Sequence, residues 1–241
     1  GMAFTDVYNL TGKRALVTGA SSGLGDHFAR ALAAQGAEVV LAARRLEKLE
    51  TLAAEIEAAG GKAYPVAMDV TKADSVEAAF AEIAANLDGP CDIIVNNSGV
   101  GQASWFQETT EEEWQSIIDT NLTGVWRVAK AATNALLKAG KPGSIINISS
   151  ICGLRGFSGL ALYSTTKAGL LGLTISLARE FGSKNIRVNA VAPGYLETAM
   201  SEGLSEQQLT QIVRRTPLGR LVSLDEIVAT VDFLCSDSAK S

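Results

Sequence analysis

The sequence predicts a single α/β domain over residues 1–241, built on a doubly wound parallel sheet. Two observations lead to this fold class. Short apolar, β-branched runs alternate with longer amphipathic stretches, and a glycine-rich turn follows the first of these runs. Strands this apolar are typical of parallel sheets covered by helices on both faces, and right-handed crossovers then give the doubly wound arrangement. No composition shift, linker or internal repeat divides the chain.

Each predicted strand is a short run rich in valine, isoleucine or alanine. In chain order the strands cover 14–19, 38–44, 62–70, 91–97, 143–150 and 186–193. Amphipathic periodicity predicts the helices between them and one near the end of the chain. These cover 24–35, 45–59, 73–86, 110–139, 161–182 and about 224–235, with Gly124 as a candidate break in the longest. The carboxyl ends of the strands then share one edge of the sheet, where ligands of such folds bind.

The composition argues against several kinds of partner. The formal net charge is −5 and no basic tract is present, which disfavours nucleic acid and anionic membrane surfaces. No stretch approaches the roughly 20 apolar residues of a membrane span. The chain is therefore expected to be soluble.

The cysteines and the N-terminus indicate a compartment. Cys91, Cys152 and Cys235 are few, odd in number and without metal-ligand spacing. No metal site is predicted, and a reducing environment fits this usage better than a disulfide framework. The N-terminus has no signal-peptide core, and Gly1 ahead of Met2 looks like a cloning remnant. We expect a cytoplasmic protein.

A glycine-rich loop, "VTGASSGLG" at 17–25, follows the first predicted strand and opens the first predicted helix. Glycine permits a tight turn and the close approach of a ligand to the backbone. The amino end of the following helix favours a phosphate. In the first turn of an alternating α/β chain, this pattern predicts the dinucleotide site of a Rossmann fold. The candidate contacts are Gly19, Ser21, Ser22, Gly23, Leu24 and Gly25.

The end of the second strand predicts which dinucleotide binds. Folds that take NAD(H) usually place a carboxylate there for the ribose 2′-hydroxyl, but this chain has Ala43, Arg44 and Arg45. A guanidinium can hold a 2′-phosphate bidentately, so we expect NADP(H) rather than NAD(H). The alternative is that both arginines are solvated residues at a helix start. Asp69, followed by Val70, is a candidate contact for the adenine amino group or else an N-cap for the helix near 73.

Six short motifs occur in a fixed order along the chain. They are "TGASSGLG", "NNSG" at 96–99, "NLTG" with Asn121, "NISS" with Ser150, "YSTTK" at 163–167 and "APG" at 192–194. Together they resemble the short-chain dehydrogenase/reductase family, from about residue 10 to the end. One departure is Ser98, where the family usually has alanine. The resemblance implies an oxidoreductase in which a nicotinamide cofactor carries the hydride.

The resemblance also implies catalytic roles. Tyr163 and Lys167 share one helix face because they are four residues apart. A free tyrosine has a pKa of about 10, which a nearby ammonium lowers. Tyr163 would then donate the proton when a carbonyl is reduced, and Lys167 would also hold the nicotinamide ribose. Ser150 would bind the substrate oxygen, and Asn121 would support a water chain to the lysine.

Further cofactor contacts are implied by the positions that match the family motifs. Asn97 and Gly99 belong to "NNSG". Pro193, Gly194 and Thr198 match the segment that holds the nicotinamide and begins a mobile substrate loop. The segment "VGQASWF" at 100–106 is expected to border the substrate pocket with its aromatic pair.

The tail from 192 to 237 resembles that of 3-oxoacyl-acyl-carrier-protein reductases, which implies a 3-oxoacyl thioester as substrate. Lys141 and Lys184 match basic residues that bind the acidic acyl carrier protein near the active-site mouth in those enzymes; the alternative is ordinary surface charge. Ser22 departs from that group, in which an arginine is frequent at this place. A sugar, polyol or gluconate dehydrogenase of the same family is the alternative substrate class. A non-catalytic NADP-binding regulator is the alternative of another kind.

The end of the sequence bears on assembly. Family members usually continue past this point into one more strand, which completes the sheet and contributes to a tetramer interface. We interpret the sequence as truncated, or limited to ordered residues, rather than as carrying a deletion, because a deletion would leave an open sheet edge. A homo-oligomer is expected, with a homotetramer as the specific prediction.

Overall fold

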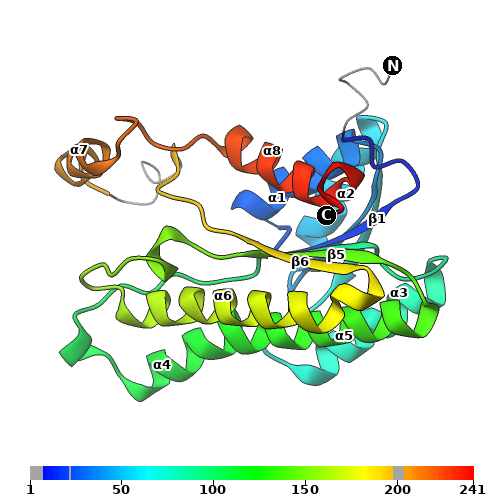
Figure 1. Ribbon diagram of the computed structural model, residues 1–241, viewed down its shortest axis with the longest axis horizontal. Helices are drawn as coiled ribbons and strands as arrows, with labels where there is room; N and C mark the ends of the chain where they lie inside the picture. Colours follow the sequence, from blue (N-terminus) through cyan, green and yellow to red (C-terminus); the bar gives the residue numbers. More distant parts are fainter. Residues whose placement is uncertain (1–7, 22, 198–203) are drawn as a thin grey trace.

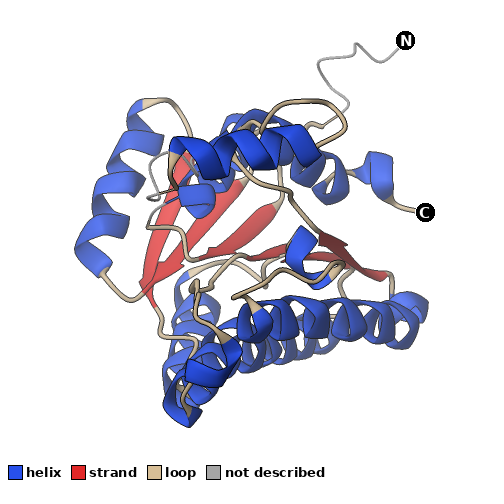
Figure 2. Cartoon of the chain, turned by 90° about the vertical axis from the view of Figure 1, so that its left-hand side faces the viewer, coloured by secondary structure: helices blue, strands red, loops and turns tan. Residues whose placement is uncertain are grey.

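The computed structural model describes residues 8–21, 23–197 and 204–241. Within these ranges, six parallel strands form one sheet in the order β3-β2-β1-β4-β5-β6 (Figures 1 and 2). The sheet is the doubly wound Rossmann arrangement that the sequence predicts. The strands are β1 (Arg14–Thr18), β2 (Glu38–Ala43), β3 (Lys62–Ala67), β4 (Ile93–Asn96), β5 (Gly143–Ile148) and β6 (Ile186–Val191).

Helices cover both faces of this sheet (Figure 1). One layer contains α1 (Gly23–Ala34), α2 (Leu46–Ala58) and α8 (Leu224–Cys235). The other contains α3 (Ala73–Asn86), α5 (Gly124–Ala139) and α6 (Ala161–Phe181), with α4 (Glu111–Ile118) packed against α6. Side chains of each strand alternate between the two layers. In β1, for example, Val17 packs toward α1 and α2, whereas Leu16 packs toward α3 and α5.

The predicted strands run one to three residues too far at their carboxyl ends. The prediction 62–70 ends as β3 at Ala67, and the prediction 143–150 ends as β5 at Ile148. The residues beyond these ends leave the sheet ladder and form the loops at its carboxyl edge. Ligands of open α/β sheets bind at that edge. The residues wrongly predicted as strand are therefore among the candidate site residues.

The predicted helix 110–139 is interrupted just before Gly124, the candidate break. Between α4 and α5 lies one π-helical turn, η3 (Asp119–Thr123), in which Asn121 is fully buried. A β-carbon on Gly124 would lie 2.7 Å from Cγ2 of Val70. Glycine is required here because the loop after β3 passes so close to the helix backbone.

One helix was not expected from the sequence. α7 (Glu206–Arg215) lies in the segment assigned to a substrate loop, and Ser205 begins it with a capping box to Gln208. Its side chains contribute nothing to the buried core, but its sequence is clearly amphipathic, so helical periodicity could have predicted it. Among the described residues, no helix is both long enough and apolar enough to span a membrane.

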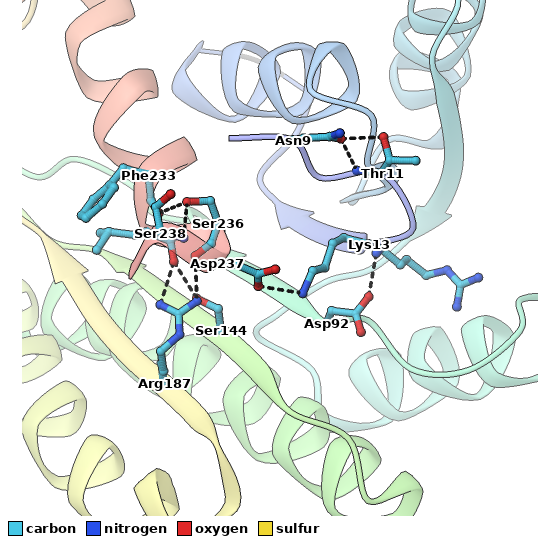
Figure 3. Close-up of polar contacts among 12 residues, drawn as sticks. Asn9, Thr11, Lys13, Asp92, Ser144, Arg187, Phe233, Ser236, Asp237 and Ser238 are labelled. Carbon is cyan, nitrogen blue, oxygen red and sulfur yellow. Dashed lines mark hydrogen bonds and ion pairs between the residues drawn. The ribbon is translucent and has the colours of Figure 1, made fainter. Parts of the chain in front are cut away.

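The amino edge of the sheet is held by polar contacts to the end of α8 (Figure 3). Arg187 Nη1 and Ser144 Oγ both donate to the carbonyl oxygen of Leu234, at 2.9 and 3.1 Å. Lys13 Nζ lies 3.4 Å from Oδ1 of Asp237. These contacts fix the end of α8 against β5 and β6, so that its other end, at Leu224, lies at the carboxyl edge.

Candidate active site

A cleft of about 1010 Å³ runs along the carboxyl edge of the sheet, with walls formed by the loops after all six strands. Most of the predicted site residues line it. They are Gly19, Ser21, Gly23, Leu24, Arg44, Arg45, Asp69, Val70, Asn97, Gly99, Ser150, Tyr163, Lys167, Pro193 and Gly194. Gly25 and Asn121 lie behind its wall, and Ser22 and Thr198 lie outside the described residues.

The glycine loop needs its glycines for two different reasons. Gly19 and Gly23 have φ angles of 61° and 59°, in the left-handed region that side chains disfavour. A β-carbon on Gly25 would lie 2.0 Å from the carbonyl oxygen of Gly19. The loop therefore turns tightly and packs closely onto the start of α1, which leaves backbone at the floor of the cleft.

The loop after β4 is tied to the glycine loop. The backbone N–H groups of Asn97 and Ser98 both donate to Oγ1 of Thr18, each at 3.0 Å. Asn97 Nδ2 donates to the carbonyl oxygens of Thr18 and Gly19, each at 3.3 Å. Asn97 thus holds two cleft loops together.

The far end of the cleft carries positive charge. Arg44 and Arg45 are exposed, and neither forms an ion pair within the ranges that the structure covers. Across the cleft, Asp69 Oδ1 accepts from the N–H and the hydroxyl of Thr71 at 3.0 and 2.7 Å. Burial would raise the pKa of Asp69, but the Thr71 hydrogen bonds and the charges of Lys72 and Arg44 outweigh it and lower that pKa.

The capping alternative for Asp69 is wrong. The N-cap of α3 is Lys72, which makes no side-chain cap. Asp69 instead closes its own turn onto Thr71 through Oδ1, and the residue lines the cleft.

At the other end of the cleft, Tyr163 and Lys167 lie one turn apart on α6. Lys167 Nζ is 5.7 Å from the centre of the Tyr163 ring and donates to the carbonyl oxygen of Ile148 at 2.9 Å. The lysine is almost completely buried, and this burial lowers its pKa to about 8, although Cys152 acts in the opposite sense. A buried lysine next to a phenol fits a proton-transfer site better than a surface helix pair.

Ser150 begins the loop after β5 on the same side of the cleft. Its Oγ accepts from the N–H of Cys152 at 3.1 Å, and the neighbouring Ser149 Oγ donates to the carbonyl oxygen of Lys167 at 2.8 Å. A β-carbon on Gly153 would lie 2.8 Å from the Lys167 carbonyl carbon. This close packing fixes the Ser150 loop directly against the helix turn that carries Lys167.

Asn121 makes contacts that the sequence did not predict. Its Oδ1 accepts from the N–H of Val100 at 2.7 Å, and its Nδ2 donates to the carbonyl oxygen of Val100 at 2.9 Å. The same Nδ2 donates to Oγ1 of Thr166 at 3.3 Å, and that hydroxyl donates to the carbonyl oxygen of Tyr163. The π turn thus aims Asn121 so that it joins the loop after β4 to the Tyr163 turn.

The loop after β6 is pinned where it leaves the cleft. The carbonyl oxygen of Pro193 accepts from the N–H of Ile151 at 2.9 Å. Tyr195, Leu196 and Glu197 then run beside Val222, with hydrogen bonds of 2.9 and 3.0 Å. The two ends of the segment 198–221 are therefore held together at the cleft rim.

Two expectations about the rim are corrected by the fold. Lys141 and Lys184 precede β5 and β6, so they lie at the amino edge of the sheet. They do not flank the mouth of the cleft in the same chain, because a parallel sheet places that mouth at the opposite edge. In the segment 100–106, Val100, Gly101, Gln102 and Ala103 line the cleft, but the exposed pair Trp105 and Phe106 does not.

Four residues have roles in the site that the sequence did not assign to them. Thr18 and Thr166 hold site loops, Val100 is the partner of Asn121, and Tyr195 lines the cleft. Both threonines lie inside the recognised motifs, so their position was a usable signal. Val100 lies in the segment 100–106 that was expected to border the pocket, but its contact with Asn121 joins two separate segments and left no local signal. The position of Tyr195 on the cleft wall left none either.

A doubly wound sheet with a glycine loop at one end of its cleft and a serine, tyrosine and lysine at the other defines a dinucleotide-dependent oxidoreductase. The chain belongs to the short chain dehydrogenase family, whose profile matches residues 13–209. This family membership confirms the resemblance noted in the sequence motifs.

Similar proteins within the family have names that describe different activities. The chain is 42% identical to the 3-oxoacyl-acyl-carrier-protein reductase FabG of Escherichia coli (strain K12), over 96% of this chain and 93% of the relative. It is 39% identical to Nodulation protein G of Rhizobium sp. (strain N33), over 97% and 93%. A crystal structure of a gluconate 5-dehydrogenase from Burkholderia cenocepacia J2315, in complex with NADP and tartrate, superposes with a TM-score of 0.94 at 33% identity, over 99% and 93%.

Proposed function

We propose that this protein is an NADP(H)-dependent reductase that converts a carbonyl group to a secondary alcohol, with Tyr163 as the proton donor. The observation that carries the proposal is the placement of Lys167 Nζ 5.7 Å from the Tyr163 ring, beside Ser150, in the cleft that begins at the glycine loop. This pairing supports catalysis over a regulator that only binds the nucleotide, since binding alone does not need the phenol.

The residues fit a bound NADP(H). The absent β-carbon of Gly25 lets the glycine loop pack onto the start of α1, where the N–H groups at the amino end of the helix would meet a pyrophosphate. Arg44 and Arg45 are cations without ion pairs in the described ranges, at the place where a ribose 2′-phosphate would lie. When bound, the nicotinamide would supply the hydride. Asp69 would contact the adenine end and Pro193 and Gly194 the nicotinamide end.

The chain's own residues would manage the oxygen and the proton. Ser150 Oγ would hold the substrate oxygen, and the Tyr163 hydroxyl would donate a proton to it. At neutral pH, Lys167 remains mostly protonated because its pKa, although lowered, is about 8. Its positive charge then stabilises the phenolate left on Tyr163. Asn121 would hold the Val100 loop and the Tyr163 turn in register, and a water chain from it to Lys167 stays a prediction.

For the substrate we propose a 3-oxoacyl thioester, supported by the 42% identity to FabG over nearly the whole chain. Since Lys141 and Lys184 lie at the amino edge, a carrier protein docked at the same chain's cleft would meet other basic residues. Arg155 is an exposed cation near the mouth. Its guanidinium stacks 5.7 Å from the Phe157 ring, which meets the Tyr195 ring edge-on at 5.9 Å.

The second candidate is a gluconate or polyol dehydrogenase, favoured by the structural likeness to the gluconate 5-dehydrogenase. The test follows nicotinamide absorbance with an acetoacetyl thioester, in parallel with NADPH and NADH. Oxidation of gluconate, glucose and sorbitol is measured beside it. Turnover of the thioester with NADPH supports the reductase, while turnover of a sugar acid alone assigns the second candidate. No turnover of any of them would refute both.

We also propose a homotetramer in the cytoplasm. α4, α5 and α6 expose large apolar side chains on the outer layer, among them Trp114, Trp126 and Ile175, and patches of this kind mark protein interfaces. All three cysteines are buried free thiols, which fits a reducing compartment. A sedimentation profile showing only monomer at micromolar concentration would reject the assembly.

A further inference from the structure

A second cavity lies at the amino edge of the sheet, away from the catalytic cleft. It has a volume of about 360 Å³, is open to solvent on one side, and is bordered by α3, α5 and the turn that leads into β4. Small-molecule sites in proteins usually measure roughly 300–1,000 Å³ and have mostly apolar walls. This cavity falls within that range and shares no lining residue with the catalytic cleft.

The cavity is hollow because small side chains face each other across it. α5 contributes alanines, among them Ala132 and Ala135, and α3 contributes Phe80 and Ile83 at the opposite wall. Cys91 forms part of the floor, and burial raises its pKa to about 12, so the thiol is neutral and behaves as an apolar group. Interiors are normally packed without such gaps. The walls therefore suit an apolar body and offer little to a polar one.

The rim of the cavity carries positive charge. Lys138 lines it, and Lys141 Nζ would lie 3.2 Å from a β-carbon on Gly89, in the turn at its mouth. Neither lysine forms an ion pair among the residues the structure describes. The acidic residue of that turn is Asp88. Arg14 Nη1 fixes the turn by donating to the carbonyl oxygens of Asp88 and Gly89 at 2.8 and 2.7 Å.

We propose that this cavity is a second ligand site, which takes the aliphatic tail of a medium-chain carboxylate and holds its head group between Lys138 and Lys141. An apolar chamber with unpaired ammonium groups at its mouth complements a molecule with an alkyl chain and one negative end. The site is independent of the reaction proposed for the cleft. It gives Lys141, which the sequence suggested as a carrier-protein contact, a different anionic partner.

The test is calorimetric titration of decanoate into the full chain with NADPH at saturating concentration. Saturable binding at one site per chain is expected, with butyrate much weaker because each lost methylene lowers the affinity about fourfold. Decanol should bind more weakly than decanoate. Replacing both rim lysines (Lys138→Met with Lys141→Met) should abolish the preference for the acid over the alcohol.

The decisive variant is Ala135→Phe, which fills the cavity and should reduce decanoate affinity at least tenfold. Ala78→Phe makes the same exchange on the exposed face of α3, outside the cavity, and should bind like the wild type. If Ala135→Phe fails to fold, Ala84→Phe fills the cavity from α3. The proposal would be overturned if decanoate does not bind, or if it binds equally well to the filled variant. It would also be overturned by competition between NADPH and decanoate, or by a change of oligomeric state in the filled variant alone.

Discussion

The two edges of the sheet are formed by the same strands but have different roles: one holds the candidate site and the other anchors α8. At the carboxyl edge, backbone is held in left-handed conformations at Gly19 and Gly23, and a lysine is buried at Lys167. At the amino edge, Arg187 and Ser144 bind backbone carbonyl groups of α8 and hold the helix in place (Figure 3). The carboxyl edge contains features that lower stability and serve the proposed chemistry. The polar groups of the amino edge form hydrogen bonds that hold α8 against the sheet. Substitutions at the two edges should therefore separate activity from stability.

The largest expected effect is that of Tyr163→Phe at the carboxyl edge. Removal of the phenolic proton donor should lower kcat by about 10²–10⁴-fold, with melting temperature and NADPH affinity close to those of the wild type. Steady-state kinetics with fluorescence titration of NADPH checks this. Unchanged turnover of every active substrate would refute the catalytic proposal.

Gly25→Ala should damage the glycine loop. The added β-carbon meets the Gly19 carbonyl oxygen at 2.0 Å, so the loop must shift, at a cost of about 1–3 kcal/mol. NADPH affinity should fall by more than stability does. Gly172→Ala on α6 is the matched control, because no atom lies within 4 Å of its β-carbon. A loss of affinity as large in the control would remove the steric explanation.

Lys167→Met should abolish activity and yet stabilise the cofactor-free protein, by on the order of 1–3 kcal/mol at pH 7. The wild type holds a charged lysine in a buried place that lowers its pKa from 10.5 to about 8. Between those values the unfolded chain binds more protons than the folded one, so the stability of the wild type should rise with pH. The difference between the two proteins should thus narrow from pH 8 toward 10.5. Denaturant unfolding at several pH values measures it, and a constant difference would contradict the assignment.

Arg44→Ala should raise the Michaelis constant for NADPH about tenfold, because a charge-assisted phosphate contact is lost. The constant for NADH should change little. Equal effects on both cofactors would show that Arg44 does not read the 2′-phosphate.

Arg187→Ala probes the amino edge and should show the reverse pattern. Loss of its hydrogen bonds to the Leu234 and Ser236 carbonyl groups should lower stability by about 1–3 kcal/mol. Activity at low temperature should stay within about twofold, since by this comparison the anchoring edge takes no part in the chemistry. A tenfold change in the Michaelis constant for NADPH would show that the amino edge affects cofactor binding as well as stability.

The sequence predicted which residues lie at the carboxyl edge better than it predicted the contacts between them. The glycine loop, Ser150, Tyr163 and Lys167 lie in short motifs whose spacing is local, so strand and helix patterns placed them correctly. The Asn121 contact with Val100 joins segments 21 residues apart through a π turn, and helical periodicity does not reveal such a turn. The position of Lys141 was misjudged because the motif match was followed, although the predicted strand 143–150 begins after Lys141 and so already assigned it to the amino edge.

α7 was missed for a different reason. Its residues bury nothing in the core, although their amphipathic periodicity is pronounced. The capping box at Ser205 was a second local signal, but the resemblance of the whole tail to a substrate loop was followed instead of either signal. A segment can therefore have clear helical periodicity and still pack outside the core of its own chain.

The π turn at Asp119–Thr123 amounts to a single additional residue wound into an otherwise continuous helix. Deleting one residue there would let α4 and α5 merge with regular hydrogen bonding. The same deletion would rotate everything before it by about 100° around the helix axis, taking the Asn121 amide away from Val100. The shortened chain would have a more regular helix and lower activity. Selection for activity should therefore preserve the length of this segment, even though the deletion would make the helix itself more stable.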